Sequence, residues 1–400
     1  MIEQPVIIIT AGIILCFGVF SKLSEKSVIT SPMICVIAGV IFSFFVTEDQ
    51  ASNIRAPWVK VVAELTLVLV LFVDSSTLDL QTLIKERKLP MRLLLIGLPL
   101  TMILGIALAV PLFPDVNIWL LALMALILSP TDAALGLAVV TSESVPLTYR
   151  QTINVESGLN DGIALPPILV CLAMLSDPGD TTDVSHWAFF TIKQFVYGPI
   201  IGGLVGWLGG RIVEKASQHG WMKDTYQRLA SFSIAILAYI FAEMVHGNGF
   251  IGAYFAGMLL GTQTKIFRDR IHGFGEAFSQ ILILVIFLIT GLILIPVSYH
   301  YWNVASFIYA ALSLTVIRMV PVAISLIGSG LDLKTILFIG WFGPRGIASI
   351  LYLLMAVIAI GVAGHEQILS VVSLTVLMSI FLHGMTAVPF TRIFRNKAVR

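Results

Sequence analysis

Four ionisable residues, Asp132, Glu156, Asp161 and Arg345, lie deep within long apolar stretches of this sequence. An ionisable side chain near the middle of a bilayer costs about 2.5–3.5 kcal/mol on insertion scales, so each one requires a partner, a water-filled cavity or a function. Carboxylate oxygens are ligands for hard cations and also take up protons. These residue types at these positions therefore predict chemistry with ions and protons inside a membrane.

Asp132 closes the segment Ser129-Pro130-Thr131-Asp132, near the middle of a predicted helix over Ile118–Val140. Proline removes a backbone donor and clashes with the preceding turn, so we expect this helix to break there. Thr131 and Asp132 would then border the break. They would either bind an ion or cap the second half-helix.

Glu156, Ser157, Asn160 and Asp161 lie on one predicted helix, Ile153–Leu175. Glu156 and Asn160 are four residues apart, as are Ser157 and Asp161, so each pair shares a helix face. The two acids are five residues apart, which separates them by about 140° around the helix axis. Each carboxylate is therefore expected to meet a different partner.

Arg345 lies among three glycines and a proline in Gly340-Trp341-Phe342-Gly343-Pro344-Arg345-Gly346. This composition predicts a second break, in the middle of a helix over Ile336–Ile360. Arginine does not readily lose its proton, so Arg345 is expected to lie against a carboxylate. The two broken helices are seven apart in the predicted order, and they cross the bilayer in opposite directions. Interrupted helices at matching places in oppositely oriented halves indicate an inverted-repeat transporter.

The composition is that of a polytopic membrane protein. Of the 400 residues 58% are hydrophobic and 12% are charged, with a mean hydropathy of +0.96. Soluble domains carry about a quarter charged residues, and a net charge of +1 argues against nucleic-acid binding. Thirteen segments are candidate membrane helices, the ninth short enough to be a half-span: Pro5–Phe20, Val28–Val46, Trp58–Leu78, Leu93–Phe113, Ile118–Val140, Ile153–Leu175, Trp187–Gly210, Leu229–Val245, Phe250–Gly261, Phe278–Pro296, Val304–Ile327, Ile336–Ile360 and Ile368–Val388.

The charges between these segments predict an orientation. If the N-terminus is outside, 19 Lys and Arg residues fall in inner segments and only Arg55 and Lys60 in outer ones. Cytoplasmic loops collect Lys and Arg, so this bias places the C-terminus in the cytoplasm and the chain in the cell membrane. The longest connection, Arg211 to Arg228, is basic and is expected to be a cytoplasmic connector. Residues 1–400 are expected to form a single membrane domain without a separate soluble domain.

Three cations remain in or near the predicted spans: Lys193, Arg318 and Arg345. Lys193 lies near an outer helix end, where its ammonium group can reach water. Glu243 is a candidate accessory group among the remaining acids. The seven histidines are scattered and the three cysteines lie within spans, so the sequence indicates neither an enzyme nor a bound cofactor.

Three motifs together resemble the NhaP-type monovalent cation/proton antiporters: Ser-Pro-Thr-Asp at 129–132, Glu-Ser-Gly-Leu-Asn-Asp at 156–161 and Gly-Trp-Phe-Gly-Pro-Arg-Gly at 340–346. The stretch from Ala242-Glu243 to Gly257 is similar to the helix 8–9 region of that family. The resemblance covers essentially the whole chain in the right order. It implies an all-α, NhaA-like antiporter fold of about thirteen transmembrane helices in inverted repeats, with two broken crossing helices, assembled as a homodimer in the lipid bilayer.

The resemblance also implies roles for individual residues. Asp161 would bind either a cation or a proton, and Asp132, Thr131 and Ser157 would complete a site for Na⁺ or Li⁺. Asn160 is the Asn of the Asn-Asp pair that marks the electroneutral branch of the family. Glu156 would pair with Arg345 and hold two helices together.

On this assignment Arg345 offsets Glu156, and Asp132 and Asp161 form an acidic pair without a fixed counter-charge. Two close carboxylates in a low-dielectric site cannot both be ionised at low cost, so a cation or a proton must neutralise one of them. We therefore expect one cation to be exchanged for one proton. The alternatives are K⁺/H⁺ exchange at the same site and, in a different class, a sodium-coupled solute symporter.

Overall fold

The computed structural model describes residues 28–45, 57–77, 88–132, 135–140, 142–176, 184–260 and 265–395, with a few isolated positions before residue 20. These residues form helices joined by short turns, and no strand occurs among them. The chain divides into two compact units. Unit 1 comprises residues 1–60, 86–160 and 283–400, and unit 2 comprises residues 61–85 and 161–282.

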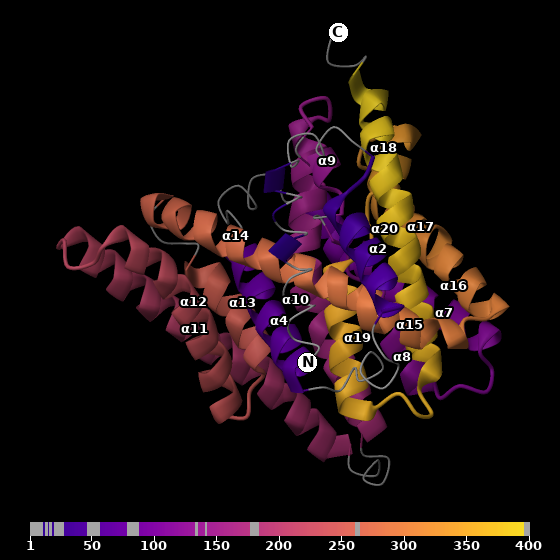
Figure 1. Ribbon diagram of the computed structural model, residues 1–400, viewed down its shortest axis with the longest axis horizontal. Helices are drawn as coiled ribbons and strands as arrows, with labels where there is room; N and C mark the ends of the chain where they lie inside the picture. The colour runs from indigo at the N-terminus through magenta and orange to yellow at the C-terminus, as the bar shows by residue number, and fades with distance from the viewer. Residues whose placement is uncertain are drawn as a thin grey trace. The chain divides into compact units, whose positions relative to one another are not determined.

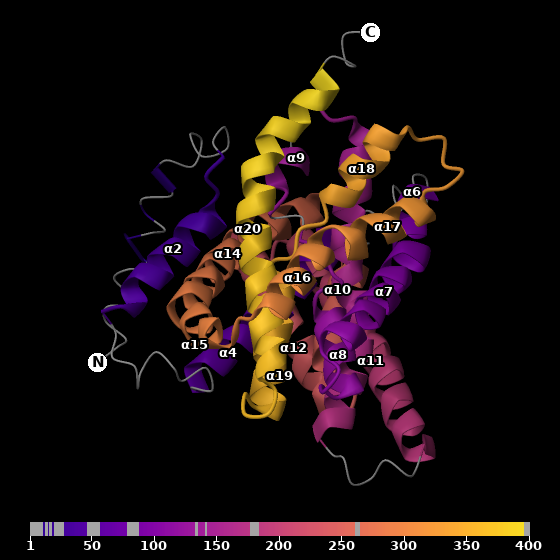
Figure 2. The same ribbon diagram turned by 90° about the vertical axis from the view of Figure 1, so that its right-hand side faces the viewer.

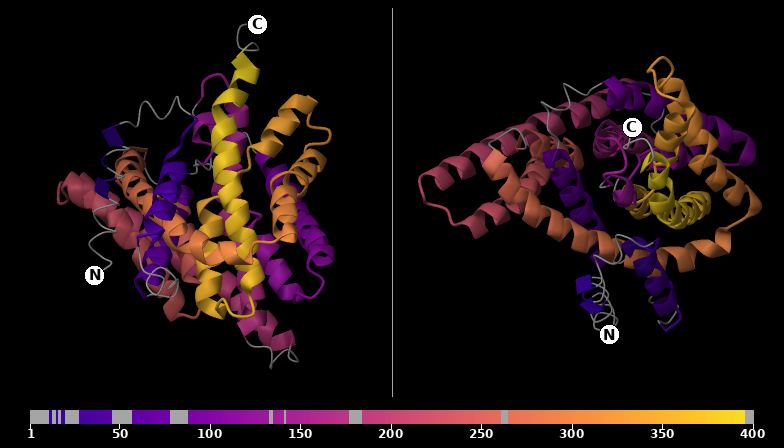
Figure 3. Two further views of the ribbon diagram at one scale, coloured as in Figure 1. Left: turned by 45° about the vertical axis from the view of Figure 1, so that its right-hand side comes forward. Right: turned by 90° about the horizontal axis from the view of Figure 1, so that it is seen from above.

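Unit 1 is built along α20 (Glu366–Arg395), which Figure 3 shows as one continuous yellow helix. Helices α16 (Val304–Leu314) and α19 (Ile347–Ile360) pack beside it (Figure 2). The unit also contains the start of α10 (Leu147–Ser176), which continues into unit 2. Its other helices are α2 (Ser31–Ser43), α6 (Lys88–Arg92), η1 (Leu93–Gly97), α7 (Leu98–Leu112), α8 (Ile118–Ile127), α9 (Leu137–Val140), η2 (Thr290–Leu294), α15 (Ile295–Ser298), η3 (Tyr299–Tyr301), α17 (Val316–Ser325) and α18 (Leu333–Trp341).

Short polar side chains determine where several of these helices begin. The Asn117 side chain accepts a hydrogen bond from Trp119 N at 2.8 Å and caps α8. Asn303 caps α16 through Ser306 N at 2.9 Å, and Asp332 caps α18 through Thr335 N at 3.3 Å. Such caps satisfy backbone donors that have no partner within the helix. The half-helices that carry the candidate site thus have defined starting points.

One apolar cluster in unit 1 brings together residues of α6, η1, α9, α10, α17, α18 and α20. The buried members of the cluster are Leu93, Val139, Val145, Ile153, Val322, Leu326, Phe338, Ile339, Phe342 and Ala387.

Elsewhere in this unit α2 crosses η2 at Gly39 and Gly291, where a Cβ on either glycine would collide with the backbone of the other helix. Small residues permit such close approach between membrane helices.

Unit 2 places α11, α12 and α13 side by side (Figure 1). Gly202 and Gly206 of α11 face the backbone at Gly252 and Ala256 of α13, so close that a Cβ on either α11 glycine would collide with a carbonyl oxygen. This four-residue spacing of small side chains is typical of tightly packed membrane helices. The unit consists of most of α4 (Pro57–Thr77), the end of α10, α11 (Val184–Gln218), α12 (Asp224–Met244), α13 (Gly249–Leu260) and most of α14 (Lys265–Ile289).

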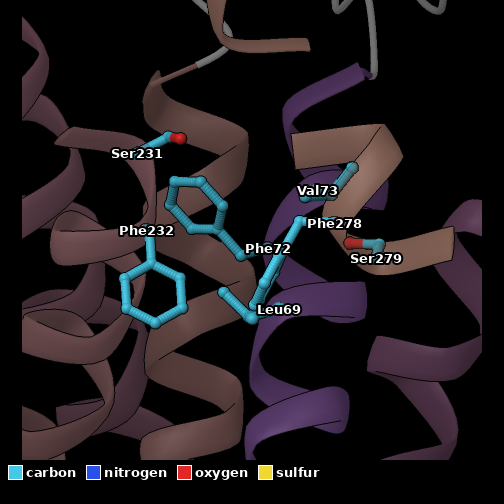
Figure 4. Close-up of a pocket in the computed structure, with 7 residues that line it drawn as sticks. All are labelled: Leu69, Phe72, Val73, Ser231, Phe232, Phe278 and Ser279. Atoms are coloured by element: carbon cyan, nitrogen blue, oxygen red, sulfur yellow. The ribbon is translucent and has the colours of Figure 1, made fainter. Parts of the chain in front are cut away.

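A cavity of about 10 Å³ separates α4, α12 and α14 in unit 2 (Figure 4). It has room for about one water molecule. The buried hydroxyl of Ser279 has no hydrogen-bond partner among the described residues. The gap is therefore a packing defect with one polar edge. It is lined by Leu69, Phe72, Val73, Ser231, Phe232, Phe278 and Ser279.

Twelve of the predicted membrane segments coincide with helices of the structure, and the first, Pro5–Phe20, lies almost entirely outside the described residues. The ninth corresponds to α13, whose 12 residues span about 18 Å and do not by themselves cross a core of about 30 Å. Among the described residues six helices are long and apolar enough to cross a membrane: Lys88–Leu112, Leu147–Ser176, Val196–Gln218, Ala277–Tyr301, Val304–Ser325 and Glu366–Thr391.

The prediction of a long connector from Arg211 to Arg228 is wrong. Helix α11 continues to Gln218 and α12 begins at Asp224, so only residues 219–223 connect them. Hydropathy falls where a chain leaves the apolar core, whereas a helix continues as long as its residues favour it. Glu214 and Lys215 are good helix formers and extend α11 beyond its apolar part.

Candidate functional site

The predicted break at Pro130 is present. Helix α8 ends at Ile127, and the described residues that follow, up to Gly136, are not helical before α9 begins at Leu137. Proline cannot donate a backbone hydrogen bond, so the helix loses its pattern at that residue. Thr131 and Asp132 lie within the break and are 2% and 8% exposed.

The second predicted break is also present. Helix α18 ends at Trp341 and α19 begins at Ile347, with non-helical backbone between them. Gly343 and Gly346 leave room for two charged side chains, because a Cβ on Gly343 would collide with the Arg318 guanidinium and one on Gly346 with the Asp132 carboxylate. These glycines are needed for close approach of side chains as well as for the break itself.

Hydrogen bonds join the two breaks, and each break carries a charged side chain that bonds to the other. Asp132 N donates to Pro344 O at 2.8 Å, and Ile347 N donates to Asp132 Oδ2 at 2.8 Å. In return, Arg345 Nη1 donates to the carbonyl oxygens of Ser129 at 2.6 Å and Pro130 at 3.0 Å. Asp132 thus lies at the positive N-terminus of α19 and Arg345 at the negative C-terminus of α8, the placement that stabilises each helix dipole.

The predicted pair between Glu156 and Arg345 is wrong. Glu156 binds Arg318 of α17 in a bidentate pair, with Oε1 at 2.5 Å from Nη1 and Oε2 at 2.8 Å from Nη2. Both side chains are 1% exposed. The Arg345 guanidinium instead donates to the backbone carbonyl oxygens that follow α8. Two arginines fall within spans and only their long-range packing determines which one meets the α10 carboxylate.

The predicted residues Thr131, Ser157 and Asn160 come together in a buried network. Thr131 Oγ1 lies 2.9 Å from Ser157 Oγ, and Asn160 Nδ2 donates to Thr131 Oγ1 at 2.7 Å. Asn160 Oδ1 is buried and has no hydrogen-bond partner among the described residues. These hydroxyl and amide oxygens are uncharged hard ligands, the type that suits an alkali cation.

Asp161 follows Asn160 directly along α10 and belongs to unit 2. Its side chain is 6% exposed. Within the same unit the neighbouring Gly162 lies against the ring of Tyr254 on α13, where a Cβ would be 3.0 Å from two ring atoms. The chain therefore holds the predicted ion-binding carboxylate in a buried stretch of helix, one residue after the polar network.

Glu243 has a local structural role in unit 2. Its Oε1 accepts a hydrogen bond from Gly249 N at 2.7 Å, and Asn248 Oδ1 accepts one from Ile251 N at 2.9 Å. Both bonds satisfy backbone donors at the start of α13. His246, which lies between Glu243 and Asn248, has a positive φ of 59° and turns the chain from α12 into α13. Glu243 therefore caps a helix.

Sequence reasoning missed three residues that contact the second break or its partners: Arg318, Ser379 and His383. The sequence marks Arg318 as a cation within a span but does not indicate its partner. Ser379 and His383 of α20 are 0% and 1% exposed and lie four residues apart on one face. A histidine and a serine at this spacing in an apolar helix were the signal that could have identified them.

Comparison with known proteins decides the family. The model of the transmembrane sodium/hydrogen exchangers matches residues 7–393. The chain belongs to the sodium/hydrogen exchanger family. As a member of that family it is a multi-pass membrane protein.

Relatives of this family member are distant. The K⁺/H⁺ antiporter NhaP of Alkalimonas amylolytica is 26% identical over 275 residues, which cover 68% of this chain and 46% of the relative. The Na⁺/H⁺ antiporter NhaP of Pseudomonas aeruginosa is 25% identical over 286 residues, covering 68% of this chain and 65% of the relative. The aligned region thus spans about half to two thirds of these curated relatives.

A solved structure shows the same fold. The sodium proton antiporter MjNhaP1 from Methanocaldococcus jannaschii superposes with a TM-score of 0.79 at 18% identity, covering 99% of both chains. At this identity the likeness concerns the fold. The prediction of an all-α antiporter fold with two broken helices is confirmed.

Proposed function

We propose that this protein exchanges Na⁺ or Li⁺ for H⁺ across the membrane, one for one, by competition of cation and proton for Asp161. The observation that carries the proposal is the buried network of Thr131, Ser157 and Asn160 beside the break in helix α8–α9. The network offers hydroxyl and amide oxygens, and its member Asn160 directly precedes Asp161 in α10. Thr131, Ser157, Asp132 and Asp161 would supply the ligands of the transported Na⁺, with Asn160 holding Thr131.

Charge counting supports a neutral exchange. The acids Asp132, Glu156 and Asp161 stand against Arg318 and Arg345, which leaves a single net negative charge on these five residues. Glu156 and Arg318 neutralise each other in their buried pair. One sodium ion or one proton then neutralises the remainder. A carrier that crosses the bilayer only when this set is neutral moves one cation in each direction and no net charge.

Potassium is the second candidate cation. The relative from Alkalimonas amylolytica is named a K⁺/H⁺ antiporter and the one from Pseudomonas aeruginosa a Na⁺/H⁺ antiporter. The same set of oxygen ligands serves both ions, because alkali cations differ in size and not in ligand preference. An ion series therefore belongs to the test.

The test uses the purified protein in liposomes that contain a pH-sensitive dye. An outward or inward Na⁺ gradient should drive proton movement in the opposite direction, at a rate that a valinomycin-imposed membrane potential does not change. Li⁺, K⁺ and choline gradients rank the cations. Rates that depend on potential would overturn the one-for-one exchange, and no cation-driven flux at all would overturn the function.

Two variants test the site. Asp161→Asn should abolish exchange, because it removes the group for which cation and proton compete. Asp115→Asn makes the same chemical change in an exposed turn between α7 and α8 and should leave the rate unchanged. Full activity of Asp161→Asn would refute the site assignment.

We further propose that the chain lies in the cell membrane as a homodimer, with its N-terminus outside and its C-terminus in the cytoplasm. The bias of 19 inner to two outer cations supports this orientation. A cysteine introduced at Lys223, which is exposed between α11 and α12, should react with an impermeant maleimide only in inside-out vesicles. Cross-linking at low protein-to-lipid ratio tests the dimer.

A further inference from the structure

Helix α20 contacts the second break at both of its ends. Arg345 N donates to Ser379 Oγ at 2.7 Å, and His383 Nε2 lies 2.9 Å from Trp341 O, the last residue of α18. One turn further along α20, Thr386 Oγ1 accepts from Trp341 Nε1 at 2.9 Å. Ser379, His383 and Thr386 recur at helical spacing, so one face of α20 holds the backbone from Trp341 to Arg345.

His383 lies near two carbonyl oxygens, which only accept: Nε2 is 2.9 Å from Trp341 O, and Nδ1 is 3.1 Å from Ser379 O. Because the contact of Nε2 is the shorter, we assign the proton of the neutral ring to Nε2, which donates it to Trp341 O. In the neutral ring Nδ1 then accepts, and Ser379 Oγ, 3.1 Å away, donates to it. The Ser379 hydroxyl in turn accepts from Arg345 N. A single chain of hydrogen bonds runs from Arg345 N through Ser379 and His383 to Trp341 O.

These bonds add to the backbone pairing of the break, in which Trp341 O also accepts from Gly343 N at 2.8 Å. The N–H groups before α19 have no acceptor within that helix, and an unpaired buried polar group is costly. The same short segment carries Pro344 O, which accepts from Asp132 N, and the Arg345 guanidinium, which reaches α8. Whatever fixes Trp341 and Arg345 therefore also fixes the contacts between the two breaks.

We propose that Ser379 and His383 are positioning residues for ion exchange, which hold the break between α18 and α19 in the conformation that meets Asp132 and Ser129. The inference rests on the proposed function. Without these bonds the break samples other conformations, and only a fraction of the protein is competent to bind the cation. Apparent affinity falls in proportion to that fraction.

The experiment compares four variants in the liposome assay. His383→Leu and Ser379→Ala should each raise the apparent KM for Na⁺ about fivefold, the effect expected from the loss of one buried hydrogen bond. His383→Gln keeps an N–H donor for Trp341 O and should restore KM to within about twofold of wild type. Thr375→Val is the matched control, because among the described residues that buried α20 hydroxyl bonds only to Val371 O of its own helix.

Amide hydrogen exchange gives a readout that does not depend on transport. In Ser379→Ala the peptide that contains Arg345 and Ile347 should exchange faster than in wild type, while peptides from α16 stay unchanged. Unaltered KM and unaltered exchange in both His383→Leu and Ser379→Ala would overturn the inference. An equal rise of KM in Thr375→Val, or failure of His383→Gln to restore it, would do the same. Absence of exchange activity in wild type would instead overturn the proposed function.

Discussion

The two helix breaks are equivalent in position and different in construction. The break after α8 is flanked by side chains, with Thr131 joined to Ser157 and Asn160 of α10. The break after α18 is built from glycine and proline and is held through its backbone by α20. Side-chain oxygens gather at the first break, whereas the second presents mainly backbone groups. The first is therefore suited to bind an ion and the second to support it.

The charges follow the same division. Asp132 of the first break caps α19, and Arg345 of the second caps α8, so each break stabilises the half-helix of the other. Glu156 has Arg318 as its own hydrogen-bonded partner. Charged residues inside this bundle thus stabilise helix ends, besides the role proposed for them in ion binding.

The largest effect is expected at the Glu156–Arg318 pair, which fixes α17 to α10 beside the second break. Arg318→Met leaves a buried carboxylate uncompensated and should lower the free energy of unfolding by about 3–5 kcal/mol. The measurement is the thermal melting midpoint and the folded yield in detergent. Adding Glu156→Leu should restore most of the loss, because no buried charge is then unpaired. If Glu156→Leu restored the stability of Arg345→Met and not that of Arg318→Met, Glu156 would pair with Arg345, as the sequence alone predicted.

A smaller loss is expected when the second break is filled. Gly346→Ala brings a methyl group against the Asp132 carboxylate and should lower the free energy of unfolding by about 1–3 kcal/mol. Gly340→Ala is the control, since its Cβ would meet neighbouring atoms at ordinary distances from 3.5 Å. Melting midpoints of the two variants report the difference. Equal midpoints would show that close packing at Gly346 is not required.

A substitution in the first break should affect the rate of transport more than the stability of the fold. Thr131→Val removes the hydroxyl that joins Ser157 and Asn160, at a cost of about 1 kcal/mol to folding. The same loss of a ligand should raise the KM for Na⁺ by about fivefold or more. Sodium-dependent proton flux in liposomes measures this. A KM within error of wild type would remove Thr131 from the site and weaken the contrast between the breaks.

The smallest change in stability is expected for Asp132→Asn. The amide oxygen still accepts from Ile347 N, and the lost interaction of the charge with the α19 N-terminus should cost about 0.3–1 kcal/mol. Exchange should nevertheless fail, because the five ionisable residues around the breaks would then be neutral without a bound ion. Melting and flux measured on one preparation test both statements. Normal flux would reduce Asp132 to a helix cap.

Local features of the chain were predictable from the sequence. Pro130 and the glycines from Gly340 to Gly346 act on the backbone at their own positions, and both breaks occur where they were expected. The resemblance to the NhaP-type antiporters, and no local rule, grouped Thr131, Ser157 and Asn160, whose side chains form one hydrogen-bonded network. The end of α11 was predicted less well, because hydropathy reports the edge of the membrane and not the end of a helix.

What the sequence by itself determined is therefore where the chain breaks and which residue types border each break, since proline, glycine and the i, i+4 spacing are properties of a few neighbouring residues. Only the tertiary structure decided the partners. Glu156 and Arg318 are 162 residues apart, and Arg345 and His383 belong to different helices. A carboxylate attracts any arginine equally at the level of sequence, and the packing of α17, α18 and α20 selects the one that reaches it.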